Sequence, residues 1–161
     1  MRCGAKLEEL HRQLGPHTDI AADGRPRRWK PRLHYWGAIE VLICHSTVIS
    51  LSLQTWRDTA QLPGQLGLGN TPIPCRLSHV DVMDSLNAAE IAWQDAPELL
   101  VIPGDGDARG VRTMPANVEL VFWDHDGTGR NDTTLRLKGA YKSDPNVRCG
   151  PHPDSGPPDG R

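Results

Sequence analysis

AIEVLICHSTVISLSL, residues 38–53, carries the clearest structural signal in the chain. Ile39, Val41 and Ile43 recur at every second position, and Ile49, Leu51 and Leu53 do the same beyond the short polar break HST. Period-two alternation on both sides of a break is typical of a β-hairpin with one buried face. The stretch therefore predicts a hairpin whose other face, with Ser50, Ser52 and Gln54, turns to water or to a partner.

A second stretch repeats this organisation. VELVFWDHDGTGRNDTTLRL, residues 118–137, reads as a strand, an acidic glycine-rich turn and another strand. Val118–Phe122 and Ile39–Ile43 each place a glutamate second in an otherwise apolar run of five. A helix is predicted before each stretch, over residues 5–14 and 78–93, from leucines and other apolar residues three and four apart. Ser78 is expected to cap the second helix, whose apolar stripe is Val82, Leu86, Ala89 and Trp93, and ELLVIP, residues 98–103, is expected to form a short strand. The repeated order indicates an internal duplication, although two half-buried strands can also resemble each other by chance.

The expected fold class is α+β, with two helix-plus-antiparallel-meander units. A helix on a small meander leaves an open edge and a marginal core, so two such units would share a sheet or pack side by side. We expect a single domain over residues 1–142, with sub-units 1–61 and 75–142 joined by the Pro/Gly linker LPGQLGLGNTPIP. Residues 143–161, poor in apolar side chains, are expected to form a disordered tail.

Composition limits the possible functions. The net charge of −2 selects neither an acidic nor a basic partner. No apolar run approaches membrane-spanning length, and the N-terminus lacks the apolar region of a signal peptide, so we expect a cytoplasmic protein with no membrane contact. The cysteines are scattered, which favours reduced thiols over a zinc site or disulfides; they are Cys3, Cys44, Cys75 and Cys149.

The acidic turn, residues 124–132, is a candidate metal site. Asp124, Asp126 and Asp132 fall at positions 1, 3 and 9 of a calcium-type loop. Leu135 stands where the bidentate glutamate of such a loop belongs, and the flanking pattern has the period of strands. A plain hairpin turn is therefore favoured over a divalent-metal site, and no cofactor is expected.

The basic stretch, residues 25–32, is a candidate binding segment. Arg27, Arg28 and Trp29 lie among further cations and prolines, a combination that suits nucleic acid through phosphate neutralisation and base stacking. The footprint is short and the chain as a whole is mildly acidic. We therefore expect a protein partner rather than nucleic acid.

Tryptophans and glutamates give further candidates. Trp36 and Trp123 are candidate interface anchors, with the filling of a sheet edge as an equal alternative. Trp123 follows Phe122, so one of this pair should point away from the core. Glu40 and Glu119 could meet if the two units were related by a twofold rotation. The expectation favoured here is that each lies on a wetted face of the sheet.

The first 65 residues resemble a group of small, uncharacterised actinobacterial proteins. The resemblance rests on Leu14-Gly15-Pro16, Tyr35-Trp36-Gly37 and Ile39-Glu40-Val41. This group is similar to proteins that accompany polymorphic toxins as immunity factors. The resemblance implies a non-catalytic protein that binds another protein, and it implies no catalytic residue. The absence of a nucleophile elbow or a phosphate loop agrees with that expectation.

Overall fold

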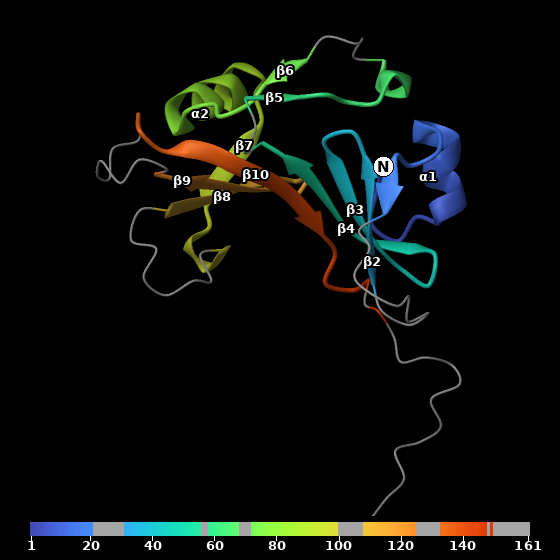
Figure 1. The fold of residues 1–161 in the computed structure, drawn as a ribbon. Coiled ribbons are helices and arrows are strands. Elements are labelled where there is room, and N and C mark those ends of the chain that lie inside the picture. The colour runs from blue at the N-terminus through green and yellow to red at the C-terminus, as the bar shows by residue number, and fades with distance from the viewer. Residues whose placement is uncertain are drawn as a thin grey trace, which may run out of the picture.

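The computed structural model describes residues 1–20, 31–55, 58–67, 72–99, 108–124, 133–147 and 149. The fold is α+β, with two α-helices on an antiparallel sheet (Figure 1). In chain order the elements are α1 (Leu7–Leu14), β1 (Asp19–Ile20), β2 (Arg32–Trp36), β3 (Ile39–Cys44), β4 (Thr47–Gln54), β5 (Thr59–Ala60), η1 (Gly64–Leu66), β6 (Ile73–Pro74), α2 (His79–Ala88), β7 (Ala92–Asp95), η2 (Pro97–Leu99), β8 (Ala108–Met114), β9 (Glu119–Trp123) and β10 (Arg136–Ser143).

The main sheet has eight strands in the order β1-β2-β3-β4-β10-β9-β8-β7. Every pairing in it is antiparallel. The order reads the same from both edges inward: each half is a meander whose last strand lies at the centre, where β4 pairs with β10. The two predicted units therefore share one sheet.

The β3–β4 hairpin forms as its alternation predicts. His45 and Ser46 connect the strands with φ of 48° and 59°, and two consecutive positive φ angles are those of a type I′ turn. Opposite Leu42 and Ile43 the register shifts, which leaves Ile49 as an extra residue. The bulge puts Val48, rather than Ile49, in the core with Leu51 and Leu53.

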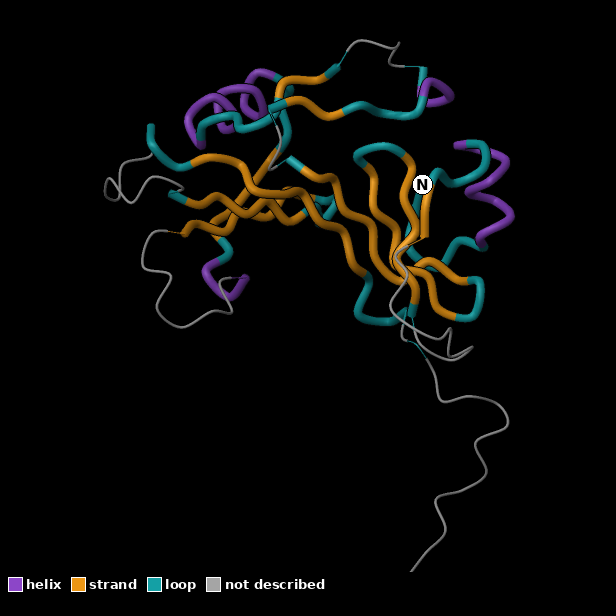
Figure 2. Tube along the Cα trace, viewed as in Figure 1, coloured by secondary structure: helices purple, strands orange, loops and turns teal. Residues whose placement is uncertain are grey.

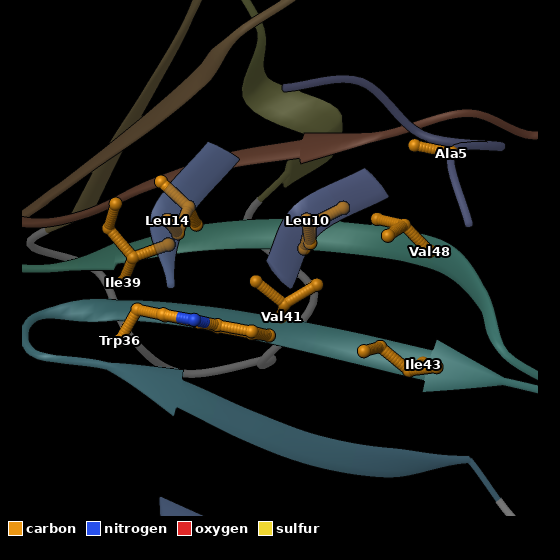
Figure 3. Packing of buried hydrophobic residues seen from close by; sticks show 8 residues of the cluster. All are labelled: Ala5, Leu10, Leu14, Trp36, Ile39, Val41, Ile43 and Val48. Atoms are coloured by element: carbon orange, nitrogen blue, oxygen red, sulfur yellow. The ribbon is translucent and has the colours of Figure 1, made fainter. Parts of the chain in front are cut away.

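One core cluster fills the space between α1 and the first half of the sheet. Leu10 and Leu14 of α1 point toward Ile39 and Val41 of β3 and toward Trp36 (Figure 3). Leu10, Val41 and Trp36 are at most 2% exposed. The four-residue spacing of Leu10 and Leu14 on the helix and the two-residue spacing of Ile39 and Val41 on the strand bring these four side chains together, as the sequence predicted.

A second cluster lies under α2, whose start and end are both fixed by hydrogen bonds. Ser78 caps the helix: its Oγ accepts from the amide of Asp81 at 3.1 Å, as expected. At the other end Glu90 has φ 56°, and the amide of Ile91 donates to the carbonyl of Leu86 at 2.9 Å. This C-terminal cap normally uses glycine, so no stop signal for the helix is visible in the sequence.

The early end of α2 corrects one prediction. Trp93 was expected on the helix stripe with Val82 and Leu86, but it lies in β7. There it packs on the same cluster from the edge of the sheet. The cluster comprises Val82, Met83, Val111, Leu120, Phe122, Leu135 and Leu137.

Both clusters lie on the same face of the sheet. Leu53, packed on the first cluster, pairs directly with Ala140, packed on the second, and directly opposed residues share a face. Figure 1 shows β5 and β6 running along this side between the two helices. Figure 2 shows η2 on the other side.

Other boundaries differ from the sequence predictions. Residues 98–103 were expected as a strand, yet Glu98 and Leu99 belong to η2. The supposed Pro/Gly linker contains η1 and half of the small β5–β6 sheet. Ser143 ends β10, and the described residues just after it form a turn in which the amide of Val147 donates to Asp144, so order extends past the predicted start of the tail.

The cysteines also differ from expectation. Cys44 and Cys149 form a disulfide across 105 residues, with a Cα–Cα distance of 5.6 Å, whereas all four cysteines were expected as thiols. Their spacing carries no signal, because only the fold brings residue 149 beside the end of β3. Cys3 and Cys75 are free, as predicted.

Among the described residues, no helix combines the length and the apolar character needed to cross a lipid bilayer.

Candidate binding surface on the open face of the sheet

A row of mostly polar side chains crosses the face of the sheet that lies opposite α1 and α2. Its members are directly opposed on neighbouring strands, so all of them point to this face. We call these residues the polar row and this face the open face. From β2 to β7 the row is Tyr35, Glu40, Ser52, Tyr141, Glu119, Arg112 and Gln94.

Glu40 lies near the middle of the row. Its Oε2 accepts from Ser52 Oγ at 3.0 Å, and its Oε1 accepts from Gln54 Nε2. Both donors are neutral, and none of the ion pairs among the described residues includes Glu40. The carboxylate is half-buried, and among the described residues its negative charge is met by two neutral donors and by no cation.

Glu119 occupies the matching position on the other side of the sheet centre but has a different partner. Arg112 donates through Nη2 to Glu119 Oε1 at 3.2 Å, and its Nη1 lies 2.8 Å from Glu98 Oε1 in η2. The hydrogen bond to Glu119 is the main reason that the pKa of Arg112 is raised. This end of the row is therefore closed by an ion-pair cluster under η2.

Glu40 and Glu119 are in one row but do not meet. Three strand spacings separate them, which amounts to about 14 Å. The hypothesis that a twofold relation brings them close is therefore wrong. Two carboxylates so far apart cannot share a proton or ligate one metal ion.

Tyr141 lies between the two glutamates. Its ring covers Gly139 of the same strand, where a Cβ atom would collide with the phenol, so the glycine lets the ring lie along the sheet. Tyr141 is 37% exposed, and burial of the remainder, followed by the charge of Glu40, raises the pKa of its hydroxyl. The phenol therefore stays protonated at neutral pH and is available as a donor or acceptor.

Trp123 extends the open face beyond the row. Phe122 is fully buried against His79 of α2, so its neighbour Trp123 points the other way, as the sequence predicted for one of the pair. Lys138 Nζ lies 3.6 Å from the centroid of the Trp123 ring. The indole is half-buried, and Val121, two residues earlier on the same strand, points to the same face.

The structure gives Trp36 a different place from the one expected. It is 2% exposed, and its Nε1 donates to the carbonyl of Gly15 at 2.8 Å, which joins β2 to the end of α1. A side chain in this position cannot contact a partner. The tryptophan of the Tyr35-Trp36-Gly37 sequence is thus a core residue, and its expected exposure is corrected.

Several predicted residues lie outside the described part of the chain. These are Arg27, Arg28 and Trp29 of the basic stretch, and Asp126 and Asp132 of the acidic turn. Asp124 is described and is 4% exposed. The metal and nucleic-acid alternatives, which depend on these segments, stay predictions.

Tyr141 and Arg112 were missed by sequence reasoning. Tyr141 lies beyond Leu137, where the predicted strand ends, and no pattern in the sequence distinguishes Arg112. Their only signal is the register of β10 and β8, which places them beside Glu119. Alternation along a strand predicts which face of the sheet each side chain points to. It does not predict which residue lies opposite on the neighbouring strand.

A histidine cluster lies apart from this surface, at the junction of α1 and β2. His11 and His17 are hydrogen-bonded at 3.0 Å between their ring nitrogens, and His17 contacts the edge of His34 with ring centroids 4.7 Å apart. His34 is 5% exposed, and its Nδ1 has no hydrogen-bond partner. Burial, and then the neighbouring His17, His11 and Arg32, lower its pKa below the ordinary value of 6.5.

We therefore expect the protein to lose stability as pH falls. A histidine with a lowered pKa binds fewer protons folded than unfolded, so its contribution is complete above pH 6.5 and is lost as pH falls from there toward the folded pKa. The free energy of unfolding, measured by urea titration between pH 8 and about pH 5, should decrease. His34→Leu should flatten this dependence; an unchanged slope in that variant would show that other groups cause it.

Comparison with protein-family models, with curated proteins and with solved structures found no match for this chain.

Proposed function

We propose that this chain is a non-catalytic binding protein that recognises another protein through the open face of its sheet. The observation that carries the proposal is Glu40: a half-buried carboxylate near the centre of that face whose hydrogen-bond donors are neutral. A basic side chain of a partner would supply the missing countercharge. Charge pairs of this kind, when desolvated by a partner, contribute to specificity and to slow dissociation.

The residues around Glu40 have the composition of an interface. Tyr141 and Trp123 offer large, partly accessible aromatic surfaces, and tyrosine and tryptophan dominate binding energy where they are covered. Leu33 and Leu42, which pair on the same face, add apolar area. Eight strands span about 34 Å, which is wide enough for the roughly 800 Å² that one partner buries in a standard interface.

An immunity protein that occludes a toxin is the specific form of this proposal. The resemblance of residues 1–65 to proteins similar to polymorphic-toxin immunity factors supports it, and so does a broad face with fixed charges. The cytoplasmic location expected from the sequence belongs to the same proposal. The basic stretch with Arg27, Arg28 and Trp29 is a second segment that could contact the partner.

Removal of the Glu40 charge tests the proposal. The tagged chain is co-expressed with proteins encoded beside its gene, and the affinity of any captured protein is measured by calorimetry. Glu40→Gln keeps the size of the side chain, and we expect it to weaken binding about tenfold, or roughly 1.4 kcal/mol. Trp123→Ala should weaken binding as well.

Glu8→Lys is the matched control, because Glu8 is an exposed acid on α1, on the opposite side of the sheet. It should leave the affinity unchanged. Equal binding by Glu40→Gln, Trp123→Ala and the wild type would rule out the open face as the interface. Circular dichroism of each variant separates loss of binding from loss of fold.

We also infer that the two halves of the sheet descend from a duplicated unit. The mirror-like strand order supports this, as do the equivalent positions of β3 and β9, each with a glutamate in the polar row. If the units are equivalent, residues 1–55 alone should dimerise, with β4 pairing to its copy as it pairs to β10. Sedimentation equilibrium checks this expectation; a folded monomer would contradict it.

A further inference from the structure

Three side chains with metal-ligating atoms converge at the tip of the β3–β4 hairpin. Cys44 is the last residue of β3, His45 is the first residue of the turn, and Cys149 arrives from the far end of the chain. One ligand atom from each, two sulfurs and a ring nitrogen, all lie within 4.8 Å of one another. Cys44 Sγ lies 3.3 Å from Nδ1 of His45.

The backbone holds His45 in this position. The turn is fixed by the amide of Leu7, which donates to the carbonyl of Ser46 at 2.9 Å, and by Lys6 Nζ, which donates to Thr47 Oγ1 at 2.8 Å. His45 itself has a positive φ, a conformation that histidine adopts more readily than most side chains. The turn that carries His45 is thus fixed by contacts that do not involve Cys149.

The donor set suits zinc. Two thiolates and one imidazole, with a fourth position for water or another donor, form a common tetrahedral zinc arrangement. In the part of the chain that the structure describes, the cluster contains no carboxylate, so it does not suit magnesium or calcium, which prefer oxygen ligands. Two thiolates also balance the two positive charges of the ion.

The disulfide and the metal would use the same sulfur atoms, so they exclude each other. A thiol or phosphine reductant supplies two electrons, the S–S bond breaks, and each sulfur takes up one proton. Cys149 is the accessible point of attack, because it is half-exposed whereas Cys44 is 4% exposed. Zinc binding would then release the two thiol protons to solvent.

We propose that Cys44, His45 and Cys149 form a redox-gated zinc site: the reduced chain binds one Zn²⁺, and the disulfide-bonded chain does not. Both states tie residue 149 to the β3–β4 turn. In a reducing compartment the metal would hold this connection, and in an oxidising one the disulfide would hold it.

Cobalt binding tests the proposal. The protein is reduced with a phosphine under anaerobic conditions and titrated with Co²⁺, whose thiolate complexes absorb light through sulfur-to-metal charge transfer. We expect about one equivalent of Co²⁺ per chain, displaced by Zn²⁺, and no absorption from the disulfide form. A reduced wild-type protein that binds neither ion would overturn the proposal.

Variants locate the site. Cys44→Ser and Cys149→Ser should abolish the charge-transfer absorption, and His45→Asn should weaken Zn²⁺ binding by roughly tenfold or more. Asparagine also accepts a positive φ, so the last change preserves the turn. Cys149 lies after β10 and outside the sheet, so Cys149→Ser should leave the fold intact. This variant therefore tests the site even if Cys44→Ser fails to fold.

Cys3 and Cys75 provide matched controls. Burial raises the pKa of both thiols, for Cys3 with help from the charge of Asp144, which disfavours the thiolate that a metal needs. Cys3→Ser and Cys75→Ser should therefore bind Co²⁺ like the wild type. Retention of the absorption by Cys149→Ser, or its loss in either control, would show that the ligands lie elsewhere.

Discussion

Phe122→Ala should lower the free energy of unfolding by about 3–5 kcal/mol. Phe122 is fully buried at the centre of the second cluster, with the ring of His79 at a centroid distance of 4.9 Å. Its removal leaves a cavity between α2 and β9 that the neighbouring strands cannot fill without moving. Since total stabilities of domains are about 5–15 kcal/mol, the loss should be evident as a large shift in the urea midpoint.

Trp123→Ala is the adjacent control. The indole is half-buried on the other face of β9, where it loses its cation–π contact with Lys138 and only part of its packing. We expect a cost of no more than about 1–2 kcal/mol, in spite of the larger side chain that is removed. If the two alanine variants were equally destabilised, the assignment of the two faces of β9 would be incorrect.

Gly37→Ala should be the second strongly destabilising change, with a cost of about 2–4 kcal/mol. Gly37 turns the chain between β2 and β3 with φ 62°, a conformation that disfavours any Cβ. An added Cβ would also collide with the backbone carbonyl oxygen of Gln61, which accepts the amide of Ala38 at 2.9 Å. A backbone atom held in a hydrogen bond cannot move away as a flexible side chain can. The energy of the steric collision therefore adds to the energy of the strained φ angle.

Gly67→Ala isolates the contribution of backbone strain. Gly67 has φ 72°, but an added Cβ would meet no atom within 4 Å. We expect a cost of about 1 kcal/mol, measured by the same urea titrations. Similar losses at the two glycines would mean that the approach of Gln61 to Gly37 contributes little.

Some features of the fold could be predicted from the sequence pattern alone. Alternation in Ile39–Ile43 and Val118–Phe122 gave the buried face of each strand, and Val41 and Phe122 are fully buried as a result. Leucine spacing gave α1, and Ser78 gave the start of α2. These features follow from contacts within a few residues, where side-chain direction is set by the local backbone.

The candidate site was only partly predictable. Glu40 and Trp123 were recognised as residues of an outer face, but the row that connects Glu40 to Tyr141 depends on the pairing of β4 with β10. The end of α2 was missed because Glu90 adopts the positive φ that glycine usually provides. The prediction for Trp36 was wrong because an aromatic residue in a strand is common on both the buried and the exposed face of a sheet. The local sequence therefore does not show that α1 covers its side chain.

The sequence by itself determined α1, the start of α2, the β3–β4 hairpin and the inward faces of β3 and β9, because period and turn chemistry are local properties of the chain. The tertiary structure alone decided that β4 meets β10, that Glu40 stands beside Tyr141, and that Cys149 reaches Cys44 and His45. Strands pair through backbone groups that every residue shares, so a single sequence does not specify which distant strands become neighbours.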